Sequence, residues 1–176
     1  MTGNSLPRPG STMFQVMRGD ETQREKTISR FKFWNKWFVV PLYRANIAPL
    51  FGLGFIFVLL YHRGRKSGKQ YFTPVEYRKF NGKYYVFASR GKMTDWYRNI
   101  VASPDDVIIK IGFRKHRPNI NAELSVEERM DLLKYYVENY PKAAKYLMGW
   151  NSKTDTADIT TLEPLATFIR IIEFDI

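Results

Sequence analysis

The sequence predicts an α+β fold or a small barrel, with about six mainly antiparallel strands and two or three helices. Three observations lead to this prediction: short segments of alternating apolar residues, an Asn-Gly step between two of them, and helical periodicity with a capping signature further along the chain. A length of 176 residues fits one domain, and 44% hydrophobic residues are enough to bury a core. Wholesale disorder is therefore excluded.

The first expected strands flank a hairpin turn. Residues 55–62 are expected to form a buried strand, and residues 71–80 the next one. Asn81-Gly82 follows, and both of its positions accept a positive φ, which is what a two-residue hairpin turn requires. Residues 83–89 should therefore pair with residues 71–80.

Helices are expected where periodicity and capping residues coincide. Thr94 or Asp95 can cap a short helix to about residue 102. Ser125 and Glu128 form a capping box that opens a helix to about residue 139, and Pro141 begins another helix to about residue 150. Further strands are expected over 106–113, 119–124 and 167–175, and residues 151–164 are expected to be a polar loop.

Positive charge is concentrated in the middle of the chain. The whole sequence carries a formal charge of +11, residues 63–118 carry +10, and residues 119–176 carry −4. A localised basic segment indicates an anion site, although a solvated basic face remains the alternative. There is no cysteine and there are only two histidines, so thiolate sites are excluded and neither a His-rich metal centre nor a Ser-His-Asp triad is expected.

The beginning of the chain is expected to stand apart from the domain at 46–176. Residues 1–25 contain Pro and Gly but no apolar run, which predicts a flexible arm rather than a secretory signal. Residues 26–45 are expected to form an amphipathic helix, because Phe31, Trp34, Phe38 and Leu42 recur at helical spacing and basic residues accompany them within 28–43. This pattern suits contact with an anionic membrane surface or packing on the protein body. The apolar part of 45–62 is too short to span a bilayer.

The glycine-bounded loop 64–69 is the first candidate for binding an anion. Gly64 and Gly68 are separated by three residues and Gln70 follows Lys69, so the loop does not match a P-loop. Its backbone N–H groups can still converge on an anion, with an ordinary basic turn as the alternative. Asn99 is expected to bond a backbone carbonyl and hold the preceding loop.

Taken together, several ordered motifs resemble the deazaflavin-dependent nitroreductase family. They are Leu59–Gly68, Thr73-Pro74 before the Asn81-Gly82 hairpin, Ala88-Ser89-Arg90-Gly91, Trp96-Tyr97-Arg98-Asn99 and Tyr140-Pro141. The resemblance covers about residues 54–150 and implies a split β-barrel of about six strands with two to four helices. It also implies the deazaflavin coenzyme F420 and hydride transfer to a quinone, nitro or enone-like acceptor.

The resemblance also assigns residues to roles. Those implied to contact the cofactor are Arg65, Lys66, Ser67, Thr73, Pro74, Ala88, Ser89, Arg90 and Trp96. Ser89, Tyr140 and Tyr146 are the candidates for orienting the acceptor or donating a proton. A flavin mononucleotide (FMN) barrel, or a non-catalytic module for nucleic acid or a membrane surface, remains the alternative. A homodimer and a cytoplasmic, membrane-associated location are further expectations.

Overall fold

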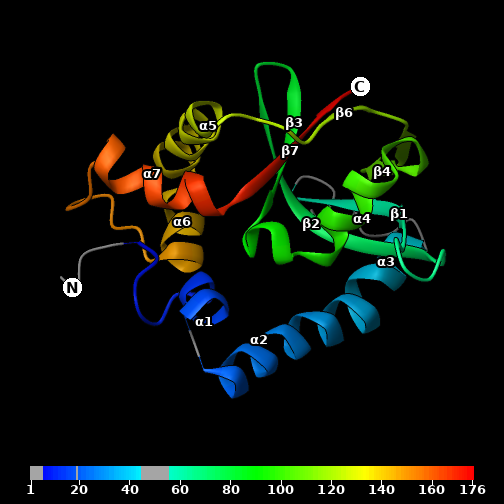
Figure 1. Ribbon diagram of the computed structural model, residues 1–176, viewed down its shortest axis with the longest axis horizontal. Helices are drawn as coiled ribbons and strands as arrows, with labels where there is room; N and C mark the ends of the chain where they lie inside the picture. The colour runs from blue at the N-terminus through cyan, green and yellow to red at the C-terminus, as the bar shows by residue number, and fades with distance from the viewer. Residues whose placement is uncertain (1–5, 19, 45–55) are drawn as a thin grey trace. The chain divides into compact units, whose positions relative to one another are not determined.

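The computed structural model describes residues 6–18, 20–44 and 56–176, and they form an α+β fold (Figure 1). Seven strands make one curled sheet in the order β5-β4-β1-β2-β3-β7-β6, which gives the half-barrel of a split-barrel protein. The described residues fall into two compact units. One unit holds the sheet (31–88, 92–123 and 171–176), and the other is mainly helical (residues up to 30, 89–91 and 124–170).

The strands of the sheet unit are antiparallel in every pair for which the register is defined. Leu60 lies opposite Thr73 in one neighbouring strand and opposite Ile109 in the other. The strands are β1 (Phe57–Arg63), β2 (Gln70–Phe80), β3 (Lys83–Ala88), β4 (Ile108–Ile111), β5 (Arg114–His116), β6 (Asn119–Asn121) and β7 (Arg170–Asp175). Residue 55, where the first strand was expected to begin, lies outside the described residues.

The expected hairpin is confirmed. Phe80 pairs with Lys83, and the two turn residues have φ values of 47° at Asn81 and 82° at Gly82. A β-branched residue could not adopt these angles without strain, which explains why the turn falls at this step.

One face of the sheet packs on helix α4 (Asp95–Ala102). Val58 and Leu60 of β1 are buried in a cluster with Ile109 of β4 and Ile100 of α4. Because side chains alternate along a strand, His62 continues this inward row, and it is also buried. On the opposite face, Leu59 contacts Val39, Val40 and Leu42.

Two strand expectations differ from the structure. The stretch 106–113 does not form one strand, because Gly112 has a φ of 57° and turns the chain between β4 and β5. The expected strand 167–175 begins only at Arg170, and the preceding residues belong to helix α7 (Ile159–Phe168). The loop expected over 151–164 therefore ends in a helix, whose interior Pro164 disfavours a helical prediction. Burial of Leu162, Leu165 and Ala166 stabilises α7 despite it.

The helical unit contains the elements that capping residues predicted. Helix α5 (Val126–Asn139) begins with the complete Ser125–Glu128 capping box, and α6 (Pro141–Met148) begins with its proline. Figure 1 shows α5 beside α6 and α7, which it contacts. Buried Arg129 of α5 donates hydrogen bonds to the carbonyl oxygens of Leu124 and Ala166.

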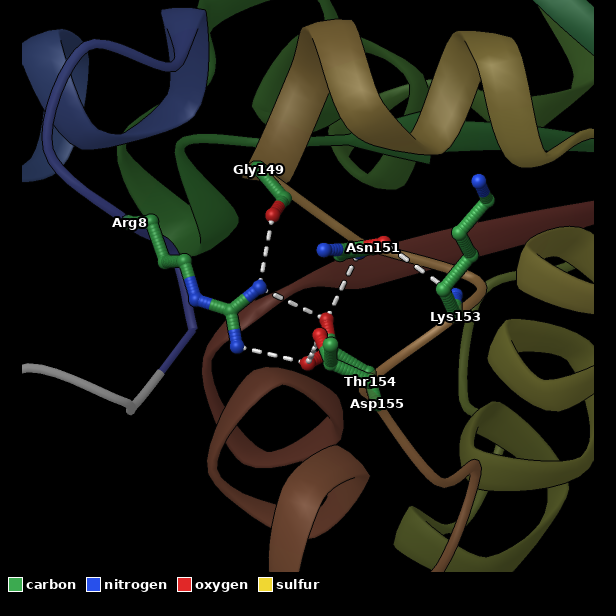
Figure 2. A network of polar contacts seen from close by, with 6 residues as sticks. All are labelled: Arg8, Gly149, Asn151, Lys153, Thr154 and Asp155. Atoms are coloured by element: carbon green, nitrogen blue, oxygen red, sulfur yellow. Dashed lines mark hydrogen bonds and ion pairs between the residues drawn. The ribbon is translucent and has the colours of Figure 1, made fainter.

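The described part of the expected arm at 1–25 is folded. It contains α1 (Thr12–Arg18) and the start of α2 (Glu21–Trp34), and Leu6 and Met13 are buried. Arg8 donates to the carbonyl oxygen of Gly149 at 2.9 Å and pairs with Asp155 (Figure 2). These buried and paired groups explain why Pro and Gly in the sequence do not make this segment an arm.

The expected helix at 26–45 is longer and is divided. After α2 the chain continues as a π-helical turn, η1 (Asn35–Val39), and then as α3 (Val40–Arg44); residue 45 lies outside the described part. Leu42 packs on the sheet, whereas Trp34 and Phe38 are 55% and 48% exposed. The helical spacing of these three residues therefore does not correspond to one buried face.

Candidate functional site

The basic loop 64–69 is closed by its own backbone. The N–H of Gly64 donates to the carbonyl oxygen of Lys69 at 2.8 Å, and the N–H of Gly68 donates to that of Gly64 at 2.7 Å. A Cβ atom on Gly64 would lie 2.5 Å from Cε2 of Tyr71 and 2.8 Å from Oγ of Ser67, so a larger residue at this position requires one of these side chains to move. The Tyr71 hydroxyl is 3.3 Å from Oγ of Ser67. The loop therefore has a defined shape.

Two of the cations at this loop are neutralised by acidic residues and two are not. Nε of Arg63 lies 2.8 Å from Asp106, and a guanidinium nitrogen of Arg65 lies 3.2 Å from Asp95. Lys66 and Lys69 are exposed, and neither has an ion pair among the residues that the structure describes. The two lysine charges of the loop are therefore not balanced by an ion pair within the described residues.

Asn99 of α4 joins this loop to the core. Its Oδ1 accepts hydrogen bonds from the backbone N–H of Arg65 at 3.2 Å and from Nη1 of Arg65 at 2.9 Å. Its Nδ2 lies 3.2 Å from Nδ1 of His62. Asn99 thus holds the loop between β1 and β2 by accepting from a backbone N–H group. The expectation that it would bond a backbone carbonyl of the preceding loop was wrong.

His62 continues the network toward β2. It is 3% exposed, and its Nε2 lies 2.9 Å from Oγ1 of Thr73. Burial lowers the pKa of His62 from 6.5 to about 4, because the charged imidazolium would lose its hydration. The ring of Tyr71 stacks on the imidazole at a centroid distance of 5.9 Å. His62 is therefore a neutral, fixed link between Asn99 and Thr73.

A pocket of about 290 Å³ opens beside this network within the sheet unit. It is lined by His62, Arg63, Gly68, Gln70, Asp106, Ile108 and Arg117. Arg63 and Arg117 make its wall basic, and Asp106 already balances Arg63. Its size and charge suit an anionic group rather than an extended apolar molecule.

The structure brings together only some of the residues implied to bind the cofactor. Arg65 and Thr73 belong to the network through Asn99 and His62, and Ser67 contacts Tyr71 beside it. Lys66 extends from the same loop into solvent. Three others take part in packing: Pro74 and Ala88 are buried in the sheet, and half-buried Trp96 lies against the core.

The remaining candidates lie in the helical unit. Ser89 is exposed and Arg90 is half-buried, in the turn before buried Gly91. Tyr140 stands between α5 and α6, with its ring 5.9 Å from that of Tyr136. Tyr146 on α6 is 66% exposed. These two phenols therefore differ in their access to solvent.

Sequence reasoning missed His62 and Tyr71 as members of the site. His62 carries a signal that could have revealed it, because Val58, Leu60 and His62 alternate along one strand and place a polar ring on the buried face. A buried polar group requires partners, so His62 predicts a hydrogen-bond network. Tyr71 carries no such signal, because its contact with Gly64 depends on the path of the loop.

This chain is similar to several known proteins. The family model of the F420H(2)-dependent quinone reductases matches residues 41–161, which is more than half of the chain. An F420-H2 dependent reductase, FDR-A, is 29% identical over 68% of this chain and 93% of its own, with a TM-score of 0.44. A chain described as a domain-swapped dimer is 24% identical over 77% of this chain and 98% of its own, and its TM-score is also 0.44. Campylobacter jejuni ChuZ is 16% identical over 90% of this chain and 63% of its own, with a TM-score of 0.46. On the extent of the family match, the chain belongs to the F420H(2)-dependent quinone reductase family.

Proposed function

We propose that this protein binds F420H2 and reduces an apolar acceptor of the quinone, nitro or enone-like class. Membership in a family of F420H2-dependent oxidoreductases supports the reaction type. The observation that carries the proposal for this chain is the basic loop 64–69. Its Lys66 and Lys69 are exposed and have no ion pair within the described residues. They fit a cofactor with a phosphate and an oligoglutamate tail, since charge-assisted hydrogen bonds are the strong ones.

Several residues of the sheet unit would hold the anionic part of the cofactor. Lys66 and the Ser67 hydroxyl would bind phosphate oxygens, and the Thr73 hydroxyl would add a donor. Arg117 in the pocket wall would attract a carboxylate of the tail. Asn99 and His62 would act indirectly, by fixing the loop and Thr73.

When bound, reduced deazaflavin supplies a hydride. The chain's own residues must then orient the acceptor, exclude competing reactions and provide a proton. Ser89, Tyr140 and Tyr146 are proposed for these tasks, and Arg90 and Trp96 for contact with the ring system. Tyr146 is open to solvent and could therefore exchange a proton with water, whereas half-buried Tyr140 is better suited to orient an apolar acceptor.

An apolar acceptor dissolved in a membrane would suit the aromatic patch, which we define as Phe33, Trp34, Trp37 and Phe38. These side chains are 48–61% exposed, and Nζ of Lys36 lies 5.7 Å from the Trp37 ring centroid. Exposed tryptophan beside lysine is typical of a segment lying in an anionic headgroup layer. Peripheral attachment to an anionic membrane is therefore part of the proposal. No helix among the described residues is long and apolar enough to cross a bilayer.

A homodimer, expected from the family resemblance, and a cytoplasmic location complete the proposal. Sedimentation of the purified protein over a tenfold range of concentration would measure the oligomeric state. A single species with the mass of one chain, 20.8 kDa, would contradict the dimer.

The decisive experiment titrates the purified protein with F420 and with FMN while the fluorescence of each ring system is followed. We expect F420 to bind more tightly, because its longer anionic tail engages more cations. Preferential binding of FMN would favour the flavin alternative. Binding of neither cofactor, together with an RNA affinity that falls steeply with salt, would favour the nucleic-acid alternative.

A further inference from the structure

We propose that His62 and Asn99 are positioning residues, which make the hydroxyl of Thr73 present its proton to an anionic oxygen bound at the basic loop. The hydrogen bonds among Arg65, Asn99, His62 and Thr73 are present without any ligand. The identity of the bound oxygen rests on the proposed function.

The direction in which each hydrogen bond of the network is donated follows from Arg65. A backbone N–H and a guanidinium can only donate, and both of these groups of Arg65 face Oδ1 of Asn99, at 3.2 Å and 2.9 Å. Oδ1 is therefore the acceptor. The amide nitrogen of Asn99, which can only donate, then faces Nδ1 of His62 at 3.2 Å. Nδ1 must consequently carry a lone pair.

This fixes the tautomer of His62. A neutral imidazole has one donor and one acceptor nitrogen, so a lone pair on Nδ1 places the hydrogen on Nε2. Nε2 donates to Oγ1 of Thr73, 2.9 Å away. Stacking with Tyr71, at an interplanar angle of 18°, restricts tilting of the ring out of this plane.

Thr73 is the end of the network. Its oxygen accepts from His62, and its own proton has no acceptor within the described parts of the chain. Thr73 is half-buried, and its partner His62 lines the pocket together with Gly68 of the loop. A hydroxyl held in this way favours an oxygen that accepts, and a phosphate oxygen at Lys66 is the nearest chemical match.

The first experiment tests the tautomer in the protein without ligand. The ¹⁵N chemical shifts of the imidazole nitrogens at pH 7 should show His62 as the Nε2–H tautomer. Asn99→Asp should change it to the Nδ1–H tautomer or to imidazolium, because a carboxylate can only accept. Circular dichroism would establish that this variant folds. A native Nδ1–H tautomer would overturn the proposal whatever the protein binds.

The second experiment tests the ligand. F420 and inorganic phosphate would be titrated separately into the parent protein, Thr73→Val and Thr73→Ser, with exposed Thr22→Val on α2 as a matched control. Loss of a hydrogen bond to a charged group predicts binding about tenfold weaker for Thr73→Val, while Thr73→Ser and the control retain affinity. If Thr73→Val binds both ligands more weakly, the oxygen that accepts from Thr73 is a phosphate oxygen. If it binds only F420 more weakly, that oxygen is another oxygen of the cofactor.

The outcomes separate this inference from the proposed function. If F420 binds and Thr73→Val binds it equally tightly, the inference fails and the function stands. If F420 does not bind but phosphate does, and Thr73→Val weakens it, the function fails and the inference stands. Binding of neither ligand by the parent protein would overturn both statements about ligands.

Discussion

Arg8 and Asp155 are 147 positions apart in the sequence and form a bidentate ion pair, with Nη1 2.7 Å from Oδ2 and Nη2 2.6 Å from Oδ1. Asp155 also accepts from the backbone N–H of Asn151 at 2.7 Å, and Arg8 donates to the Gly149 carbonyl (Figure 2). The arginine holds the pKa of the Asp155 carboxyl below its usual value. This pair connects the segment before α1 to the segment between α6 and α7.

Arg8→Ala should lower the free energy of unfolding by about 1.5–3 kcal/mol, the usual effect of losing hydrogen bonds to a charged group. Urea unfolding at pH 7 would measure it. Lys153→Ala is the matched control, because only the backbone N–H of Lys153 takes part in this segment's hydrogen bonds. Equal destabilisation by both variants would contradict the importance of the ion pair.

The stability should depend on pH through His62, whose pKa is lowered by burial to about 4. The unfolded chain takes up a proton on this residue near pH 6.5, whereas the folded protein does so only near pH 4. The unfolded state thus binds more protons in this interval, and stability falls by about 3 kcal/mol as the pH falls through it. Urea midpoints from pH 7.5 to 4 should show this slope, and His62→Gln should reduce it. An unchanged slope in that variant would assign the pH dependence to other groups.

Gly64→Ala should distort the basic loop, because the new methyl group would lie 2.5 Å from the Tyr71 ring. We expect a loss of about 1–3 kcal/mol of stability, typical of overpacking. Tyr71→Ala removes the shortest of these contacts and leaves Oγ of Ser67 at 2.8 Å, so the double variant should lose less stability than the sum of the two single variants. Strict additivity would show that the Tyr71 ring does not determine the glycine requirement.

Lys66→Ala should weaken F420 binding about tenfold while the urea midpoint stays within the error of the parent protein, since Lys66 is exposed. Exposed Lys134→Ala on α5 is the control for loss of one positive charge. A folding defect in Lys66→Ala would mean that the residue is structural. Equal weakening in both variants would indicate a general charge effect in place of a specific contact.

The double substitution Trp34→Gln/Trp37→Gln should reduce co-sedimentation with vesicles of anionic lipid severalfold, because it removes two exposed aromatic rings from the patch. Phe113→Gln is the control, as Phe113 is 61% exposed on a turn outside the patch. Binding should also weaken as salt is raised. Equal sedimentation of the parent and the double variant would remove the proposed membrane contact.

Elements with strong local signals were predictable. The Asn81-Gly82 turn, the Ser125–Glu128 capping box and the proline that opens α6 all depend on residues within a few positions of one another. The sequence predicted a loop where α7 forms, because Pro164 lowers helix propensity and the burial of Leu162 and Leu165 cannot be seen locally. It likewise predicted an arm where Arg8 finds a partner near the other end of the chain.

By itself, the sequence determined the α+β class, the basic loop and the ordered motifs that indicated the family, since each depends on residue type and local spacing. Only the tertiary structure decided which residues of the loop are neutralised and which polar side chains support it. Arg65, Asn99, His62 and Thr73 come from four separate segments. Their hydrogen bonds depend on the register that places β1 beside β2 and on the packing of α4 against the sheet. Hydrogen bonds require approach within about 3 Å, and spacing along the chain does not specify such distances between distant segments.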